Sequence, residues 1–154
     1  MIILTFVLAG ICLAIDLITK AVFFGKSFSL IGDFLWIETS FNEGAAFGQF
    51  QGGKWIFLAL AIIVVGLICY LVISRKFKSK TLSVGLALLL GGIIGNAIDR
   101  VIFSGVRDFI YFKFINFAIF NMADAFITIG AILVIVYILF LYKPAKKEEK
   151  SDRH

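Results

Sequence analysis

Hydrophobic residues are concentrated in four long runs that contain few polar residues. The runs cover residues 2–24, 55–73, 81–98 and 125–142. A helix of about 17–25 apolar residues is long enough to cross the ~30 Å hydrocarbon core of a bilayer. The pattern therefore predicts four transmembrane helices.

Two longer connections join these runs. Within residues 28–50, aromatic and β-branched residues precede a glycine-containing turn, which is typical of short strands. The connection from Asp99 to Asp124 is rich in aromatic residues between Phe103 and Phe120, as in segments that lie at a membrane surface. We expect an all-α membrane fold: a four-helix transmembrane bundle with a small extracytoplasmic β-element and an interfacial segment.

The composition agrees with a single membrane-embedded domain, residues 1–154. Hydrophobic residues make up 61% of the 154 residues and charged residues 16%, below the roughly 25% that is usual in soluble domains. A chain of about 150 residues is the size of one domain. The hydrophobic runs leave no stretch long enough for a separate soluble core.

The chain has a formal net charge of +5, and its basic residues lie beside the hydrophobic runs. The two basic groups are Arg75, Lys76, Lys78 and Lys80, and Lys143, Lys146, Lys147, Lys150 and Arg153. Because basic loops face the cytoplasm, the sequence predicts that both termini and the tail 143–154 are cytoplasmic. The connections 25–54 and 99–124 then face outward. This placement favours a membrane protein over one that binds nucleic acid.

Polar residues inside the runs or at their ends are costly in lipid, so each one requires a partner or a function. Together with Asp108 in the outer connection, they are Asp16, Lys20, Asn96, Asp99, Arg100, Asn121 and Asp124; these eight residues are called the polar cluster below. At 1.5 Å per residue, Asp16 and Asn96 each lie about 20 Å from the cytoplasmic face. The last helix starts outside and places Asp124 at a similar depth. We expect one polar cluster near the outer leaflet.

Three pairs within the cluster have helical spacing. They are Asp16 with Lys20, Asn96 with Asp99, and Asn121 with Asp124. The first pair is four residues apart and can form an ion pair that makes helix insertion less costly. The other two place an amide beside an acid on one helix face. Hydrogen bonds that only hold the helices together would use the same spacing, so these pairs fit a structural role as well as a functional one.

The polar cluster has more acids than bases. Its aspartates are Asp16, Asp99, Asp108 and Asp124, and its cations are Lys20 and Arg100, with Arg107 expected to point away. Two carboxylates in a partly dry site share a proton, and one titrates above its usual value of about 3.9. Aspartic proteases use such a pair, one carboxylate activating water and the other donating a proton. These arguments leave Asp99, Asp108 and Asp124 as candidates for the pair.

Other catalytic chemistry has little support in the sequence. His154 is the only histidine, and Cys12 and Cys69 both lie in hydrophobic runs, where cysteine behaves as a small apolar residue. Ser-His-Asp, Cys-His and histidine-based zinc sites are therefore excluded. We expect no metal and no cofactor.

Five sequence blocks resemble those of the lipoprotein signal peptidase (signal peptidase II) family, in the same order. The blocks are residues 16–20 (DLITK), 41–48 (FNEGAAFG), 91–100 (GGIIGNAIDR), 106–110 (VRDFI) and 120–124 (FNMAD). Each block alone is a weak signal, but five on a four-helix scaffold form a specific match.

The resemblance implies roles for individual residues. Asp108 and Asp124 would be the catalytic pair; Asn96, Asp99, Arg100 and Asn121 would position it; Asp16 and Lys20 would support it; and Asn42 and Gly44 would contact substrate. The implied activity is that of an aspartyl endopeptidase of the bacterial cytoplasmic membrane. It would cut prolipoproteins immediately before a diacylglyceryl-modified cysteine, acting as a monomer among membrane lipids.

Two positions depart from the family pattern. Arg107 stands where an apolar residue is common, and Ala125 where a serine is frequent. A cation beside Asp108 would lower the pKa of that carboxyl group. The departures therefore bear on the pH profile and the substrate preference rather than on the activity itself.

Three other functions fit part of the pattern. A small ion-coupled transporter could place carboxylates near a membrane face, but no inverted repeat is evident. A structural protein could use the polar pairs for helix assembly. A Ser-Lys signal peptidase would use Lys20 as base, yet no serine is obviously placed for it, since Ser104 sits in the connecting loop with no lysine at a readable spacing.

Overall fold

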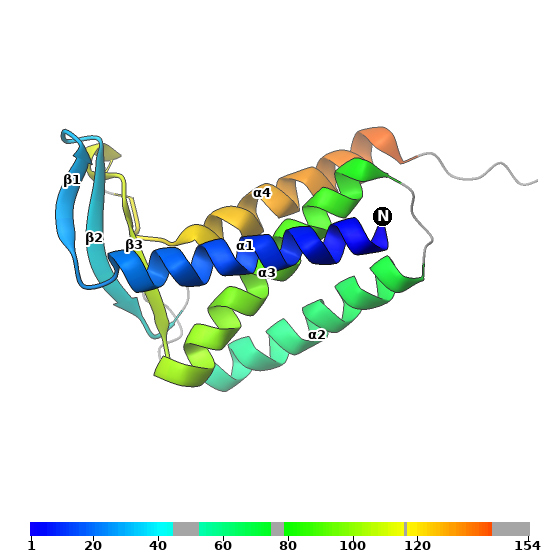
Figure 1. The fold of residues 1–154 in the computed structure, drawn as a ribbon, viewed down its shortest axis with the longest axis horizontal. Helices are drawn as coiled ribbons and strands as arrows, with labels where there is room; N and C mark the ends of the chain where they lie inside the picture. Colours follow the sequence, from blue (N-terminus) through cyan, green and yellow to red (C-terminus); the bar gives the residue numbers. More distant parts are fainter. Residues whose placement is uncertain (45–52, 75–78, 116, 143–154) are drawn as a thin grey trace, which may run out of the picture.

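The computed structural model describes residues 1–44, 53–74, 79–115 and 117–142. In these segments four long helices form a bundle, and a small sheet covers one end of it (Figure 1). The helices are α1 (Ile2–Phe23), α2 (Lys54–Ile73), α3 (Lys80–Phe103) and α4 (Met122–Val136), which continues as a π-helical turn, η3 (Tyr137–Leu141). The strands are β1 (Ser27–Ile31), β2 (Leu35–Asn42) and β3 (Val106–Tyr111), followed by a 3₁₀ turn, η2 (Lys113–Ile115).

Helix α3 is the centre of the bundle and packs against the other three helices. Its glycines allow close approach: a Cβ atom at Gly91 would collide with α1 at Ala9 and Cys12, and one at Gly92 would collide with Ala123 of α4. Gly85 similarly faces Gly130. Small residues at such contacts let helix backbones approach one another in lipid.

The outer faces of the helices are apolar and exposed. All four are long and apolar enough to cross a membrane, the fourth running from Met122 to Leu141. Helix α2 has a single buried residue, Ile68, and the highest mean hydropathy of the four. Exposed isoleucine, leucine and phenylalanine side chains are favourable on these faces if they are surrounded by hydrocarbon.

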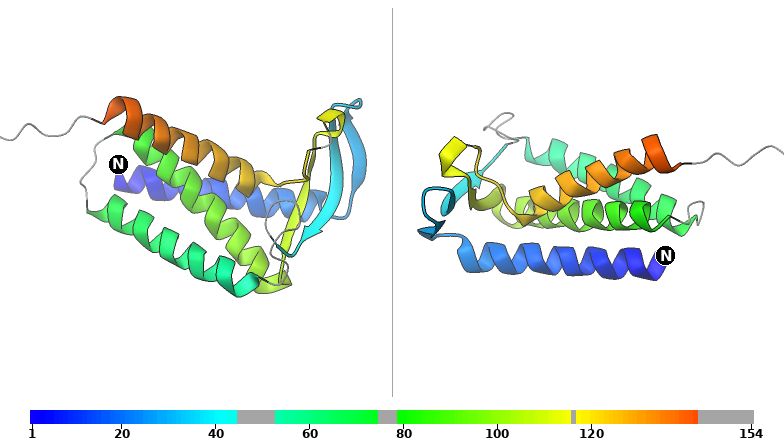
Figure 2. Two further views of the ribbon diagram at one scale, coloured as in Figure 1. Left: turned by 180° about the vertical axis from the view of Figure 1, so that it is seen from behind. Right: turned by 90° about the horizontal axis from the view of Figure 1, so that it is seen from above.

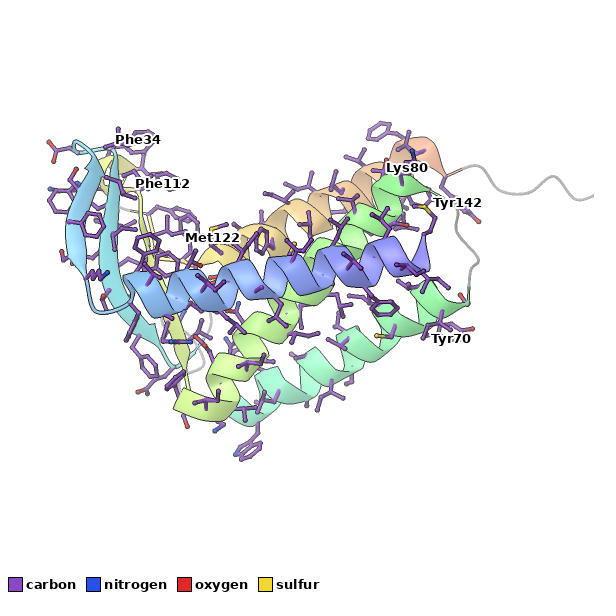
Figure 3. The ribbon with its side chains drawn as sticks, in the orientation of Figure 1. Phe34, Tyr70, Lys80, Phe112, Met122 and Tyr142 are labelled. Atoms are coloured by element: carbon purple, nitrogen blue, oxygen red, sulfur yellow. The ribbon has the colours of Figure 1, made fainter. Side chains whose placement is uncertain are left out.

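The sheet is antiparallel, with strand order β1-β2-β3. Trp36 pairs with Tyr111 and Ser40 with Asp108, with an irregularity in β2 between Ile37 and Ser40. Figure 2 shows that the sheet lies opposite the end at which α1 begins. In Figure 3, Tyr70, Lys80 and Tyr142 lie at the end where α1 begins, while Phe34 and Phe112 lie beside the strands at the opposite end. The turns after α1 and α3 and the start of α4 therefore meet beside the sheet.

The four apolar helices and the small sheet confirm the helical bundle and the β-element expected from sequence, with changed boundaries, while the extracytoplasmic side of the sheet and the interfacial position of the second connection stay predictions. Helix α3 continues past the predicted end at 98 to Phe103, because Asp99 is fully buried and Arg100 is partly buried rather than at a helix end in water. Helix α4 starts at Met122, three residues early, because Asn121 caps it. The connection from 99 to 124 contributes strand β3, so the sheet combines both connections. Residues 45–50 of the predicted β-element, Arg75, Lys76, Lys78 and the tail 143–154 lie outside the described residues.

Candidate active site

Helix α1 carries one buried stripe, and its last two members are charged. The stripe consists of Thr5, Ala9, Cys12, Asp16 and Lys20. The Lys20 Nζ atom donates to Asp16 Oδ2 at 2.7 Å and to Asn96 Oδ1 at 3.0 Å. The other oxygen of Asp16 accepts from the backbone N–H of Ala123 at 2.8 Å. This ion pair therefore ties α1 to both α3 and α4.

Asp99 is fully buried on α3 and binds Arg107 of β3. The Arg107 guanidinium donates to both Asp99 oxygens, at 2.8 and 3.2 Å, and the Arg107 backbone N–H donates at 3.0 Å. Arg107 thus points away from its neighbour Asp108, as expected. Because the charge of Arg107 is paired with Asp99, a direct lowering of the pKa of Asp108 by Arg107 stays a prediction, which this geometry does not favour. Sequence reasoning missed this pair, since eight residues and a change from helix to strand separate its members.

Asn121 and Asp124 form a capping box at the start of α4. The Asn121 side chain accepts from the Asp124 backbone N–H at 3.0 Å, and the Asp124 carboxylate accepts from the Asn121 backbone N–H at 3.2 Å. The Asn121 amide also donates to Asp108 Oδ1 at 2.6 Å. Asn96 donates to Asp124 Oδ1 at 2.7 Å. Asn121 therefore joins the two carboxylates, which lie on different elements: its side-chain amide donates to Asp108 and its backbone N–H donates to Asp124.

Asp108 and Asp124 differ from the other two aspartates of the polar cluster in having no ion pair within 4 Å among the described residues. Both line a pocket of about 580 Å³. Asp108 is 2% exposed. Burial, reinforced by the nearby negative charge of Asp124, raises the pKa of Asp108 to about 7, although hydrogen bonds from Asn121 and Asn42 oppose the rise. This agrees with the predicted pair in which one carboxyl group holds a proton.

The rim of the pocket comes from β2 and α3. Asn42 donates to Asp108 Oδ2 at 3.3 Å and accepts from the Gly44 backbone N–H at 3.0 Å. Arg100 donates to the Gly44 carbonyl at 3.1 Å, and its guanidinium lies 4.7 Å from the centre of the Phe57 ring. These contacts place the cation of Arg100 at the pocket beside the two acids.

All ten residues proposed from sequence belong to one connected network. Six of them line the pocket: Asn42, Gly44, Asn96, Arg100, Asp108 and Asp124. Asp16, Lys20, Asp99 and Asn121 lie behind it. Sequence reasoning missed the apolar wall, which includes Phe117, Ile119, Phe120, Ile127 and Ile129. Its only signal was the aromatic content of the second connection. Within the described residues, no group of His, Cys, Asp or Glu could hold a metal ion.

Comparisons with known proteins agree with the five sequence blocks. Residues 8–140 match the family model described as "Signal peptidase (SPase) II". Lipoprotein signal peptidases of Bacillus pumilus and Geobacillus thermodenitrificans are 38% and 39% identical, with 92% and 94% of this chain and 96% and 94% of each relative covered. A solved bacterial membrane enzyme, 34% identical, superposes with a TM-score of 0.82 over 95% of this chain and 93% of the other.

Proposed function

The chain belongs to the signal peptidase II family, and from this premise we propose that it removes signal peptides from lipid-modified prolipoproteins by aspartic chemistry at Asp108 and Asp124. Membership of this family makes the chain a multi-pass peptidase of a bacterial membrane, which excludes the transporter and helix-assembly alternatives. The aspartic mechanism is supported by one observation: Asp108 and Asp124, which have no ion pair within 4 Å among the described residues, face one pocket and are joined by Asn121.

The two acids have different environments, which favours different roles. Asp108 is buried and, with a pKa of about 7, holds the proton and serves as the acid. Asp124 is the third residue of α4, where the helix dipole stabilises a negative charge, and it serves as the base. Asp124 takes a proton from water as the water oxygen attacks the scissile carbonyl, which forms a tetrahedral intermediate. Asp108 then donates its proton to the amine nitrogen as the C–N bond breaks. The proton held by Asp124 finally passes to Asp108, which restores the starting state.

The surroundings suit a lipid-modified peptide. The apolar wall can cover an acyl chain and exclude bulk water, while Arg100 and Asn42 lie at the pocket to bind the peptide backbone. In the proposed orientation the sheet faces outward, and Lys80 and both termini face the cytoplasm, in accordance with the positive-inside rule. The scissile bond, just before the diacylglyceryl-modified cysteine, then lies near the outer surface of the membrane.

The direct test is cleavage of a purified lipidated prolipoprotein by the protein in detergent, followed by gel mobility. Asp108→Asn and Asp124→Asn should each lower the rate by about 10²–10⁴-fold or more, because each removes one proton-transfer group. Asp33→Asn is the matched control, since the Asp33 side chain is 88% exposed and lies in the turn between β1 and β2. It should cleave normally.

Two results would contradict the proposal. Cleavage at the wild-type rate by either dyad variant would exclude that residue from catalysis. Loss of wild-type activity on addition of a chelator would exclude a metal-free aspartic mechanism.

A further inference from the structure

Arg107 is the least expected member of the network. It immediately precedes Asp108 on β3, yet its side chain binds Asp99 with two guanidinium contacts at 2.8 and 3.2 Å. The guanidinium also lies 4.4 Å from the centre of the Phe103 ring. Its side chain is only 16% exposed. A bidentate pair of this kind is stronger and more directional than a single ion contact.

The pair determines how Lys20 is shared. The Lys20 Nζ atom lies 2.7 Å from Asp16 and 3.6 Å from Asp99. Because Arg107 already neutralises Asp99, Lys20 is free to donate to Asn96 Oδ1 at 3.0 Å. That bond orients the Asn96 amide, whose nitrogen donates to Asp124 at 2.7 Å. A continuous chain of polar contacts therefore runs from Arg107 to Asp124.

We propose that Arg107 is a positioning residue for the dyad: by holding Asp99, it keeps Lys20 on Asn96 and thereby holds Asp124 in place. Arg107 also acts directly on the backbone, because its N–H donates to Asp99 Oδ2 at the residue before Asp108. Both carboxyl groups of the pair are thus placed with reference to the same buried aspartate. The inference rests on the proposed function of Asp108 and Asp124.

Loss of Arg107 has a predictable electrostatic effect at the pocket. The groups that face Asp108 are Asp124 on α4, Lys20 on α1, Arg100 on α3, Asn121 and Asn42. Lys20 is the cation that lowers the pKa of Asp108. Without Arg107, the charge of Lys20 is shared between Asp16 and Asp99, so Lys20 lowers the pKa of Asp108 less than in the wild type. The pKa of Asp108 then rises, and activity persists to higher pH.

The experiment compares the wild type with Arg107→Met, Arg107→Lys and the double variant Arg107→Met/Asp99→Asn. For each, kcat and KM are measured against pH. The protonated-carboxyl infrared band that is absent in Asp108→Asn is titrated without substrate. Arg107→Met should lower kcat about tenfold, less than the ~10²-fold that a 1 Å misplacement can cause, with little change in KM. Its titration midpoint should move upward.

The other two variants separate charge from geometry. Arg107→Lys should keep the wild-type midpoint, because it keeps the charge, and should recover part of kcat. The double variant removes one cation and one anion, so its midpoint should return toward the wild type even if kcat stays low. If Arg107→Met cannot be purified, Arg107→Gln tests the same loss of charge.

The inference is overturned if Arg107→Met keeps the wild-type titration midpoint and the wild-type kcat, whether or not its thermal stability falls. A wild type that does not cleave prolipoprotein would refute the proposed function. The infrared midpoints would still decide whether Arg107 acts on Asp108.

Discussion

The polar cluster and its neighbours divide into two halves that use aspartate differently. In the charged half, consisting of Asp16, Lys20, Asp99 and Arg107, each carboxylate has a cation within 2.8 Å. In the pocket half, consisting of Asp108, Asp124 and the three asparagines that bind them, each carboxylate accepts hydrogen bonds from amides or the backbone. Amides fix an acid in place without cancelling its charge. The comparison suggests that ion pairing marks structural acids and amide pairing marks reactive ones.

The largest expected effect on stability comes from breaking the charged half. Asp16→Ala leaves the buried Lys20 without its closest anion and removes the contact with Ala123, so unfolding should become easier by about 3–5 kcal/mol. Thermal denaturation in detergent measures the loss. Asp16→Ala/Lys20→Met should recover part of it. If Asp16→Ala is as stable as the wild type, the charged half has no structural role.

A packing change at the border of the two halves should cost less. A Cβ atom at Gly95 would collide with the Asp16 carboxylate, so Gly95→Ala should destabilise by about 1–3 kcal/mol. The matched control is Gly66→Ala on α2, where a Cβ meets nothing within 4 Å. Thermal denaturation should show no loss for the control. Equal behaviour of the two alanine variants would show that Gly95 is not tightly packed.

The pocket half should behave in the opposite sense. The pKa of Asp108 is about 7 in the folded protein, above its ordinary value of 3.8, so the folded state binds the extra proton. The wild type therefore loses stability as the pH rises from about 4 to 7, and it stays less stable above 7. Asp108→Asn should raise stability by about 1–2 kcal/mol above pH 7 and not near pH 4. Denaturation at several pH values measures this; a uniform loss would contradict it.

The smallest effect is expected at Asn42. Its bond to Asp108 Oδ2 is long, at 3.3 Å, and lowers the pKa of Asp108. Asn42→Ala should therefore shift the alkaline limb of the pH-rate profile upward by a few tenths of a unit. The profile of kcat against pH gives the shift directly. A downward shift would mean that Asn42 does not stabilise the ionised form.

Sequence reasoning placed Asp16, Asn96 and Asp124 at one level of the bundle from helix rise and span direction, and the contacts that link them confirm this, while their depth in the bilayer stays a prediction. It also predicted the Asp16–Lys20 ion pair from helical spacing, which the structure confirms. Both inferences depend on local geometry along a single helix or on the thickness of a bilayer. Neither requires knowledge of a turn.

The pairing of Arg107 with Asp99 could not be predicted from sequence, because it depends on a reversal of the chain at Ser104 and Gly105. Ser104 adopts a left-handed conformation with a φ of 66°, and Gly105 packs against the Phe41 ring, which returns the chain as β3. Only this turn brings Arg107 back to Asp99. Physical arguments alone therefore kept Asp99 among the candidates for the reactive pair, whereas in the structure its charge is fully paired.

The Asp16–Lys20 pair also bears on biosynthesis. Helix α1 is made before α3 and α4, so when it first meets lipid neither Asn96 nor the Ala123 backbone is available to it. At that stage the two charged groups can neutralise only each other, whereas α2 carries no comparable burden and can insert unaided. The pair thus lowers the free-energy cost of inserting α1 into the bilayer before α3 and α4 have been synthesised. Replacing Lys20 should reduce how much protein reaches the membrane, in addition to any effect on the finished enzyme.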